Sequence, residues 1–226
     1  MRTDQVLAHP LVDGTLGEAT GRRHRPNAVL PRTGGPAGNA ALTAWTGLVL
    51  LVLFVAELLT LFDVRGLISW HVAIGALLVP PALLKTASTG WRMVRYYTGH
   101  GAYREAGAPP TLLRWLGPLV VLSTLGLLAS GILLVVLGAG SAHTTLVSLP
   151  DLRVDWVTLH QAFFAVWCGA TGLHLLARIV PALRATVLRA RGSSVPGRVA
   201  RLALVPVVAF VAAGLAVLVV GAATSW

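Results

Sequence analysis

Five long apolar runs constrain this chain more than any other feature of its sequence. Each run is close to the roughly 20 residues that a helix needs to cross the hydrocarbon of a bilayer. Composition agrees, because 55% of the residues are hydrophobic and 12% are charged, too few to cover a water-soluble surface. The sequence therefore predicts an all-α integral membrane bundle of five transmembrane helices, with spans at about residues 42–61, 67–87, 115–137, 157–180 and 202–222.

The first part of the chain has a different composition from the rest. It is polar and basic, and Pro26, Pro31 and the pair Gly34-Gly35 are residues that interrupt helices. We therefore expect a flexible basic N-terminal tail over residues 1–41 and a five-helix transmembrane domain over residues 42–226.

The formal net charge of +10 comes from arginines that are grouped beside the apolar runs. They precede the first run and follow the second and the fourth, whereas the connections 63–66 and 139–156 hold one arginine each. Such blocks indicate membrane orientation rather than a nucleic-acid partner. The pattern predicts a multi-pass membrane protein with a cytoplasmic N-terminus and the C-terminus outside.

Three histidines lie within the apolar runs, where a titratable side chain is costly and tends to be functional. His160 and His174 are fourteen residues apart, which on a helix is about 21 Å along one face. His71, in the second run, lies at the same predicted depth as His160. One imidazole from each of two helices is an arrangement that holds haem iron, so the spacing predicts a b-type haem with His71 and His160 as its axial ligands.

These histidines, with a fourteen-residue repeat on one helix, resemble the cytochrome b561 superfamily of small membrane cytochromes and cytochrome b subunits of bacterial hydrogenases and dehydrogenases. The segment KTASTGWRMVRYYTGHGAYREAGAPP (85–110) is similar to small actinobacterial membrane proteins of this kind. The likeness covers the second to fourth runs. It implies an electron-transfer subunit of an oxidoreductase complex, which passes electrons between the membrane quinone pool and a partner redox protein in a larger respiratory complex.

The sequence departs from this family at Lys85. A member with two haems has a histidine fourteen residues after His71, where this chain has lysine. His174 would then need another partner, either Lys85 as a deprotonated amine or His100 from the following loop. We expect one haem at His71 and His160, and His174 remains a candidate ligand of a second haem.

Other charged residues near the spans suggest supporting roles. Glu57 lies in the outward third of the first run, which suits a proton acceptor beside a quinol site or a hydrogen-bonded residue that only fixes helix packing. Arg92 and Arg95 follow the second run. They could contact haem propionates, a quinone head group or lipid phosphates, and anchoring to membrane lipid is the favoured role.

The sequence has no glycine-rich phosphate loop, nucleophile elbow or zinc-binding spacing. The electron donor or acceptor must then be a separate protein or a lipid-soluble carrier. One alternative is a non-haem accessory subunit or small transporter, in which the intramembrane histidines and Glu57 form a proton or ion path. Another is a structural anchor whose tail and basic loops dock a cytoplasmic enzyme.

Overall fold

Five long helices dominate the structure, a computed structural model that describes residues 10–23, 26–149, 152–184, 186, 195–224 and 226. All five are long and apolar enough to cross a membrane: α2 (Gly35–Thr60), α3 (Ile68–Tyr97), α5 (Thr111–Leu137), α7 (Trp156–Leu183) and α8 (Arg198–Ala222). They confirm the predicted all-α bundle of a multi-pass membrane protein. With 25 to 30 residues each, they are about 38–45 Å long and extend beyond the hydrocarbon.

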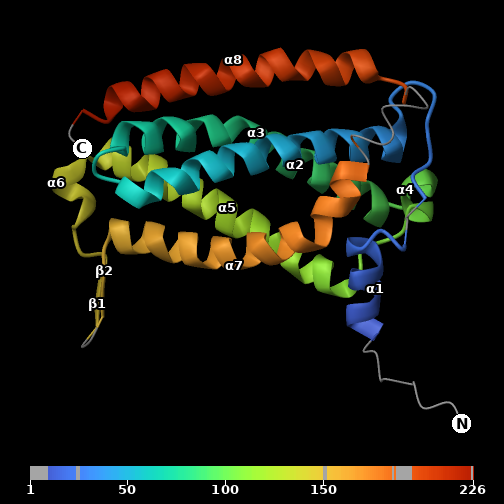
Figure 1. The fold of residues 1–226 in the computed structure, drawn as a ribbon, viewed down its shortest axis with the longest axis horizontal. Helices are drawn as coiled ribbons and strands as arrows, with labels where there is room; N and C mark the ends of the chain where they lie inside the picture. The colour runs from blue at the N-terminus through green and yellow to red at the C-terminus, as the bar shows by residue number, and fades with distance from the viewer. Residues whose placement is uncertain (1–9, 24–25, 150–151, 185, 187–194, 225) are drawn as a thin grey trace, which may run out of the picture.

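The helices run roughly along one axis, with α8 on one side of the bundle and α7 on the other (Figure 1). Helix α3 is the central element, because it packs against α2, α5 and α8, while α5 also packs against α7. Helix η1 (Leu61–Asp63) joins α2 to α3 as antiparallel neighbours. The Asp63 carboxylate closes the turn that follows it by accepting a hydrogen bond from the Gly66 amide at 3.0 Å.

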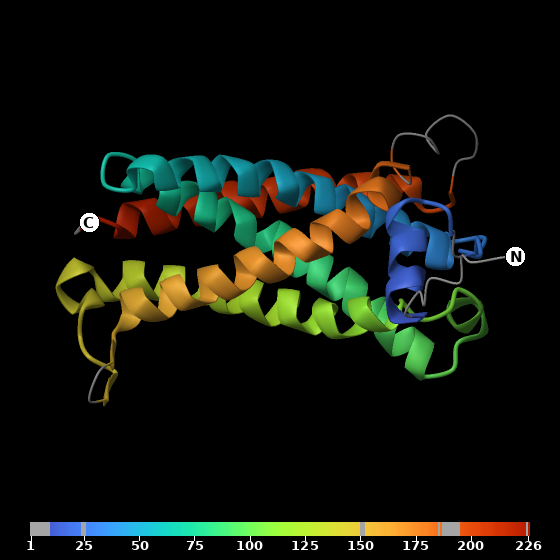
Figure 2. The same cartoon turned by 60° about the horizontal axis from the view of Figure 1, so that its bottom comes forward.

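The two ends of the bundle carry different elements (Figures 1 and 2). The hairpin end has η1, α6 (Ala139–Ala142) and an antiparallel hairpin of β1 (Val147–Leu149) and β2 (Leu152–Val154), which the sequence did not predict. The basic end has α1 (Pro10–Ala19) and α4 (Gly101–Glu105). Because α2 and α8 both start at the basic end, the chain finishes at the hairpin end.

Helix α1 lies within residues 1–41, the segment for which the sequence predicts a flexible tail. Proline is tolerated in the first helical turn, where its missing N–H has no helical partner, so Pro10 begins α1 and Pro36 lies in the first turn of α2. Helix α1 packs against α5 and α7, and its Glu18 Oε2 accepts a hydrogen bond from Arg178 Nη1 on α7 at 3.0 Å. Residues 1–9 and 24–25 of the predicted tail lie outside the described residues.

Candidate functional site: the histidine pair

His71 lies in the first turns of α3 and is held by the end of α2. Its Nδ1 atom is 2.9 Å from Thr60 Oγ1 and 3.1 Å from Glu57 Oε1. The Thr60 hydroxyl donates its proton to the Glu57 backbone carbonyl at 2.6 Å, so its oxygen accepts from the histidine. This pattern places the His71 proton on Nδ1 and leaves Nε2 as the nitrogen with a free lone pair.

His160, in the second turn of α7, repeats this arrangement with a residue of α5. Its Nδ1 atom is 2.9 Å from Ser130 Oγ, and the Ser130 hydroxyl donates to the Leu127 carbonyl at 3.0 Å. The serine oxygen therefore accepts from His160 Nδ1, and Nε2 is again the nitrogen with a free lone pair. Ser130 is buried, so this contact fixes the ring from inside the bundle.

The two imidazoles, which we call the histidine pair, meet across the bundle interior. Their ring centroids are 6.4 Å apart and their planes are inclined by 87°. Two imidazoles bound to one metal ion would have centroids about 6 Å apart, since each bond is about 2 Å long and each ring centre lies about 1 Å beyond its nitrogen. In a direct edge-to-face contact the ring centroids lie about 4.5–7 Å apart, so the observed spacing also agrees with that arrangement.

Small residues of α5 allow α7 to approach at this level. A Cβ atom added at Gly131 would lie 3.2 Å from His160 Cε1, closer than side chains normally pack, and one at Gly126 would overlap the Phe163 ring. His160 and Phe163 of α7 therefore lie directly against glycines of α5.

Glu57 lies beside the histidine pair and contacts His71 directly. Its Oε1 atom contacts His71 Nδ1, while Oε2 is buried and has no hydrogen-bond partner among the described residues. The Glu57 side chain is 17% exposed. The sequence placed Glu57 at the right depth, but the direct contact with His71 depends on helix rotation, which the sequence alone does not give.

Lys85 and His174, which we call the lysine level, lie further toward the basic end. Lys85 Nζ donates to the Thr43 carbonyl of α2 at 3.0 Å and lies over Gly47, where an added Cβ would be 2.8 Å away. His174 Nδ1 has no hydrogen-bond partner in the part of the chain that the structure describes.

The other predicted residues lie at the basic end. His100 precedes α4 and packs against Tyr103, with 5.4 Å between ring centroids. Arg92 Nη2 donates to Asn27 Oδ1 at 3.0 Å, and the Arg95 guanidinium lies 4.5 Å from the centre of the Trp91 ring. These contacts do not join any of the three to the histidine pair.

Asp155 is a helix-capping residue near the candidate site that the sequence analysis missed. It caps α7 by accepting from the Thr158 amide at 2.7 Å, and it also contacts the Thr158 hydroxyl at 2.7 Å and His143 Nδ1 at 2.9 Å. The hydrogen bonds from Thr158 and His143 lower the pKa of Asp155 to about 2. An aspartate directly before an apolar helix is an N-cap signal, and here it fixes the start of α7 five residues before His160.

Histidine, cysteine, aspartate and glutamate side chains of the described residues do not form a group of three or more that could hold a metal ion. The candidate site is therefore the two-imidazole arrangement of His71 and His160. Comparison with protein-family models, with curated proteins and with solved structures found no match to this chain.

Proposed function

We propose that the chain is a membrane b-type cytochrome, in which His71 and His160 hold the iron of one haem. A single observation carries this proposal. Two imidazoles from different helices are 6.4 Å apart, each with Nδ1 bonded to a hydroxyl and Nε2 left for a metal. Metal-binding histidines commonly have the other ring nitrogen fixed in this way.

Bound haem would supply one-electron chemistry, and the residues of the chain would hold and tune it. Thr60 and Ser130 set the orientation of the two imidazoles, and Glu57 adds a carboxyl oxygen beside His71 Nδ1. The buried Oε2 of Glu57 can hold a proton at this point, which suits a site where a quinol releases protons with its electrons.

The electron donor and acceptor are inferred from the binding motifs of the sequence. The sequence has no nucleotide-binding or flavin-binding motif, so electrons pass between the quinone pool and a partner redox protein of a larger respiratory complex. The gathering of arginines beside α1 and α4 supports a cytoplasmic basic end in a bacterial plasma membrane. The hairpin end and the histidine pair then lie toward the outer surface.

A second haem at the lysine level has less support. Lys85 is bonded to the Thr43 carbonyl, so a second imidazole does not face His174 as His71 faces His160. An ammonium that donates to a carbonyl has no lone pair for iron. We therefore assign His174 no ligand role in the proposal.

The test is a dithionite-reduced minus oxidised spectrum of the purified protein, with haem measured as its pyridine complex. The wild-type protein is expected to show a b-type Soret band, and His160→Ala is expected to abolish it. His143→Ala is the control, because His143 is exposed in the connection before the hairpin. Colourless wild-type protein, or a spectrum that survives His160→Ala, would contradict the proposal.

One observation favours a non-haem proton or ion path as the second candidate. Glu57 Oε2, Thr171 Oγ1 and His174 Nδ1 are buried without a partner among the described residues, as groups along a hydrated path would be. This candidate predicts colourless protein that moves protons across vesicle membranes. It also predicts that Glu57→Gln abolishes the flux, whereas Glu105→Gln, an exposed carboxylate of α4, leaves it unchanged.

A further inference from the structure

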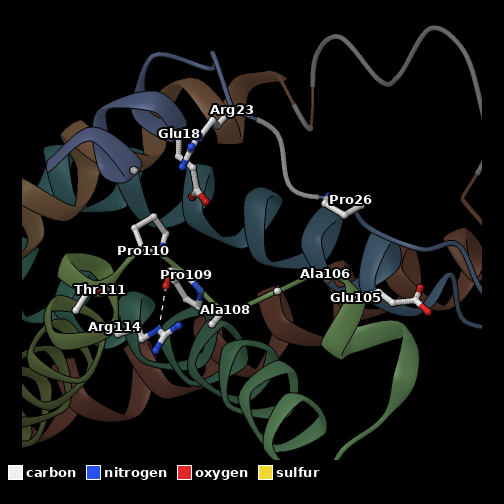
Figure 3. Close-up of a pocket in the computed structure, with 12 residues that line it drawn as sticks. Glu18, Arg23, Pro26, Glu105, Ala106, Ala108, Pro109, Pro110, Thr111 and Arg114 are labelled. Atoms are coloured by element: carbon white, nitrogen blue, oxygen red, sulfur yellow. Dashed lines mark hydrogen bonds between the residues drawn. The ribbon is translucent and has the colours of Figure 1, made fainter. Parts of the chain in front are cut away.

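A cavity of about 590 Å³ opens at the basic end, away from the histidine pair (Figure 3). Its walls are formed by α1, by Arg23 and Pro26 after α1, and by the segment that leads from α4 into α5. The volume falls within the range of about 300–1,000 Å³ that is usual for small-molecule sites. It exists because α1 docks on the bundle, a contact that the Glu18–Arg178 ion pair fixes at 3.0 Å.

Two arginines line the cavity and contribute positive charge to it. Arg23 follows α1 on one side, and Arg114 lies on the other side in the first turn of α5 (Figure 3). Arg114 Nε donates to the Pro109 carbonyl at 3.0 Å, which orients the guanidinium and leaves its two terminal nitrogens available. Among the described residues, neither arginine forms an ion pair with a carboxylate.

The two carboxylates of the lining do not neutralise these arginines. Glu18 is already paired with Arg178 of α7. Glu105 lies at the far edge of the cavity, with its carboxylate directed away from Arg23 and Arg114 (Figure 3). The cavity therefore presents two exposed guanidinium groups that lack an anionic partner within the described chain. Such groups can bind an anion with several acceptor oxygens.

We propose that this cavity binds a phosphate group, held between Arg23 and Arg114. Guanidinium groups match the oxygens of phosphate through paired hydrogen bonds. Two sources can supply the group: the head group of an anionic phospholipid, since the cavity lies at the end of membrane-spanning helices, or a free phosphate. Binding would link α1 to α5 and so hold the N-terminal segment against the bundle, independently of any haem.

The test measures ligand affinity by thermal unfolding of the full chain in a non-ionic detergent. The probes are dihexanoyl phosphatidylglycerol, dihexanoyl phosphatidylcholine and inorganic phosphate, at constant ionic strength. The variants are Arg23→Ala, Arg114→Ala, Arg114→Lys and the control Arg104→Ala, an exposed arginine of α4 outside the cavity. Each retained variant must elute as the same species as the wild type in size-exclusion chromatography.

We expect phosphatidylglycerol to bind wild-type and Arg104→Ala protein equally, and Arg23→Ala or Arg114→Ala to weaken binding roughly tenfold each, the usual effect of losing a charged hydrogen bond. Arg114→Lys keeps the charge and is expected to lose less. Equal binding of inorganic phosphate would support the site and identify a free phosphate as its source. The proposal is overturned if neither phosphatidylglycerol nor inorganic phosphate binds. It is also overturned if Arg104→Ala weakens binding as much as Arg114→Ala.

Discussion

The histidine pair and the lysine level are built on the same two helices, fourteen residues apart on each, yet they differ in how their side chains are held. At the histidine pair, each imidazole has a hydroxyl partner on a neighbouring helix, Thr60 or Ser130. At the lysine level, Lys85 bonds to a backbone carbonyl and His174 Nδ1 has no partner among the described residues. The comparison teaches that a repeated spacing makes a site only where neighbouring helices fix both rings.

The largest expected effect separates the two levels directly. His71→Ala removes one side of the histidine pair and is expected to abolish haem binding, whereas His174→Ala leaves haem content unchanged. The measurement is the haem content per protein, determined as the pyridine complex for the two variants purified in parallel. Equal losses in the two variants would show that the levels are equivalent, contrary to this account.

A second prediction is that the lysine level can be converted. Lys85→His places an imidazole opposite His174, so we expect haem content to rise from one per chain toward two. The physical reason is that lysine offers iron an ammonium, while imidazole offers a free lone pair at neutral pH. Lys85→Met is the matched control, because it removes the charge and supplies no imidazole. A rise in Lys85→Met as large as that in Lys85→His would contradict the interpretation.

A third prediction concerns the hydroxyls that hold the rings. Ser130→Ala and Thr60→Val remove the acceptors at Nδ1 and are expected to weaken haem affinity roughly 10–100-fold, as loss of outer-shell partners does at metal sites. The measurement is titration of haem-free protein with haemin. Matched controls are Ser123→Ala and Thr46→Val, whose hydroxyls bond only to carbonyls of their own helix among the described contacts. The account fails here if the controls lose as much affinity.

The smallest expected effect concerns Asp155, which caps α7 before His160. Its pKa of about 2 lies below the ordinary value of 3.8, so its contribution to stability is complete above about pH 5 and is lost as pH falls through the folded pKa. Asp155→Asn keeps an oxygen acceptor and is expected to lower the unfolding temperature slightly at pH 7. The difference from wild type should shrink at pH 3, and a difference that grows would contradict this role.

The sequence was sufficient for the five spans and for the matching depth of His71 and His160, because apolar length and residue spacing determine both. It was not sufficient for the contacts of Thr60 and Ser130 with the rings, since these depend on helix rotation and packing. Helix α1 was missed because the tail was predicted from its polar composition and from Pro26, Pro31 and Gly34-Gly35, all of which lie after α1. The hydrogen bond from Lys85 Nζ to the Thr43 carbonyl could not be predicted either, because it depends on the close approach of α2 to Lys85 at Gly47.

The central claim is that the histidine pair, and not the lysine level, holds a single haem. The most direct measurement is the haem-to-protein ratio of the purified wild-type chain, from the pyridine complex and quantitative amino-acid analysis. The account predicts one haem per chain. A ratio of zero would contradict the cytochrome proposal, and a ratio of two would contradict the difference drawn between the two levels.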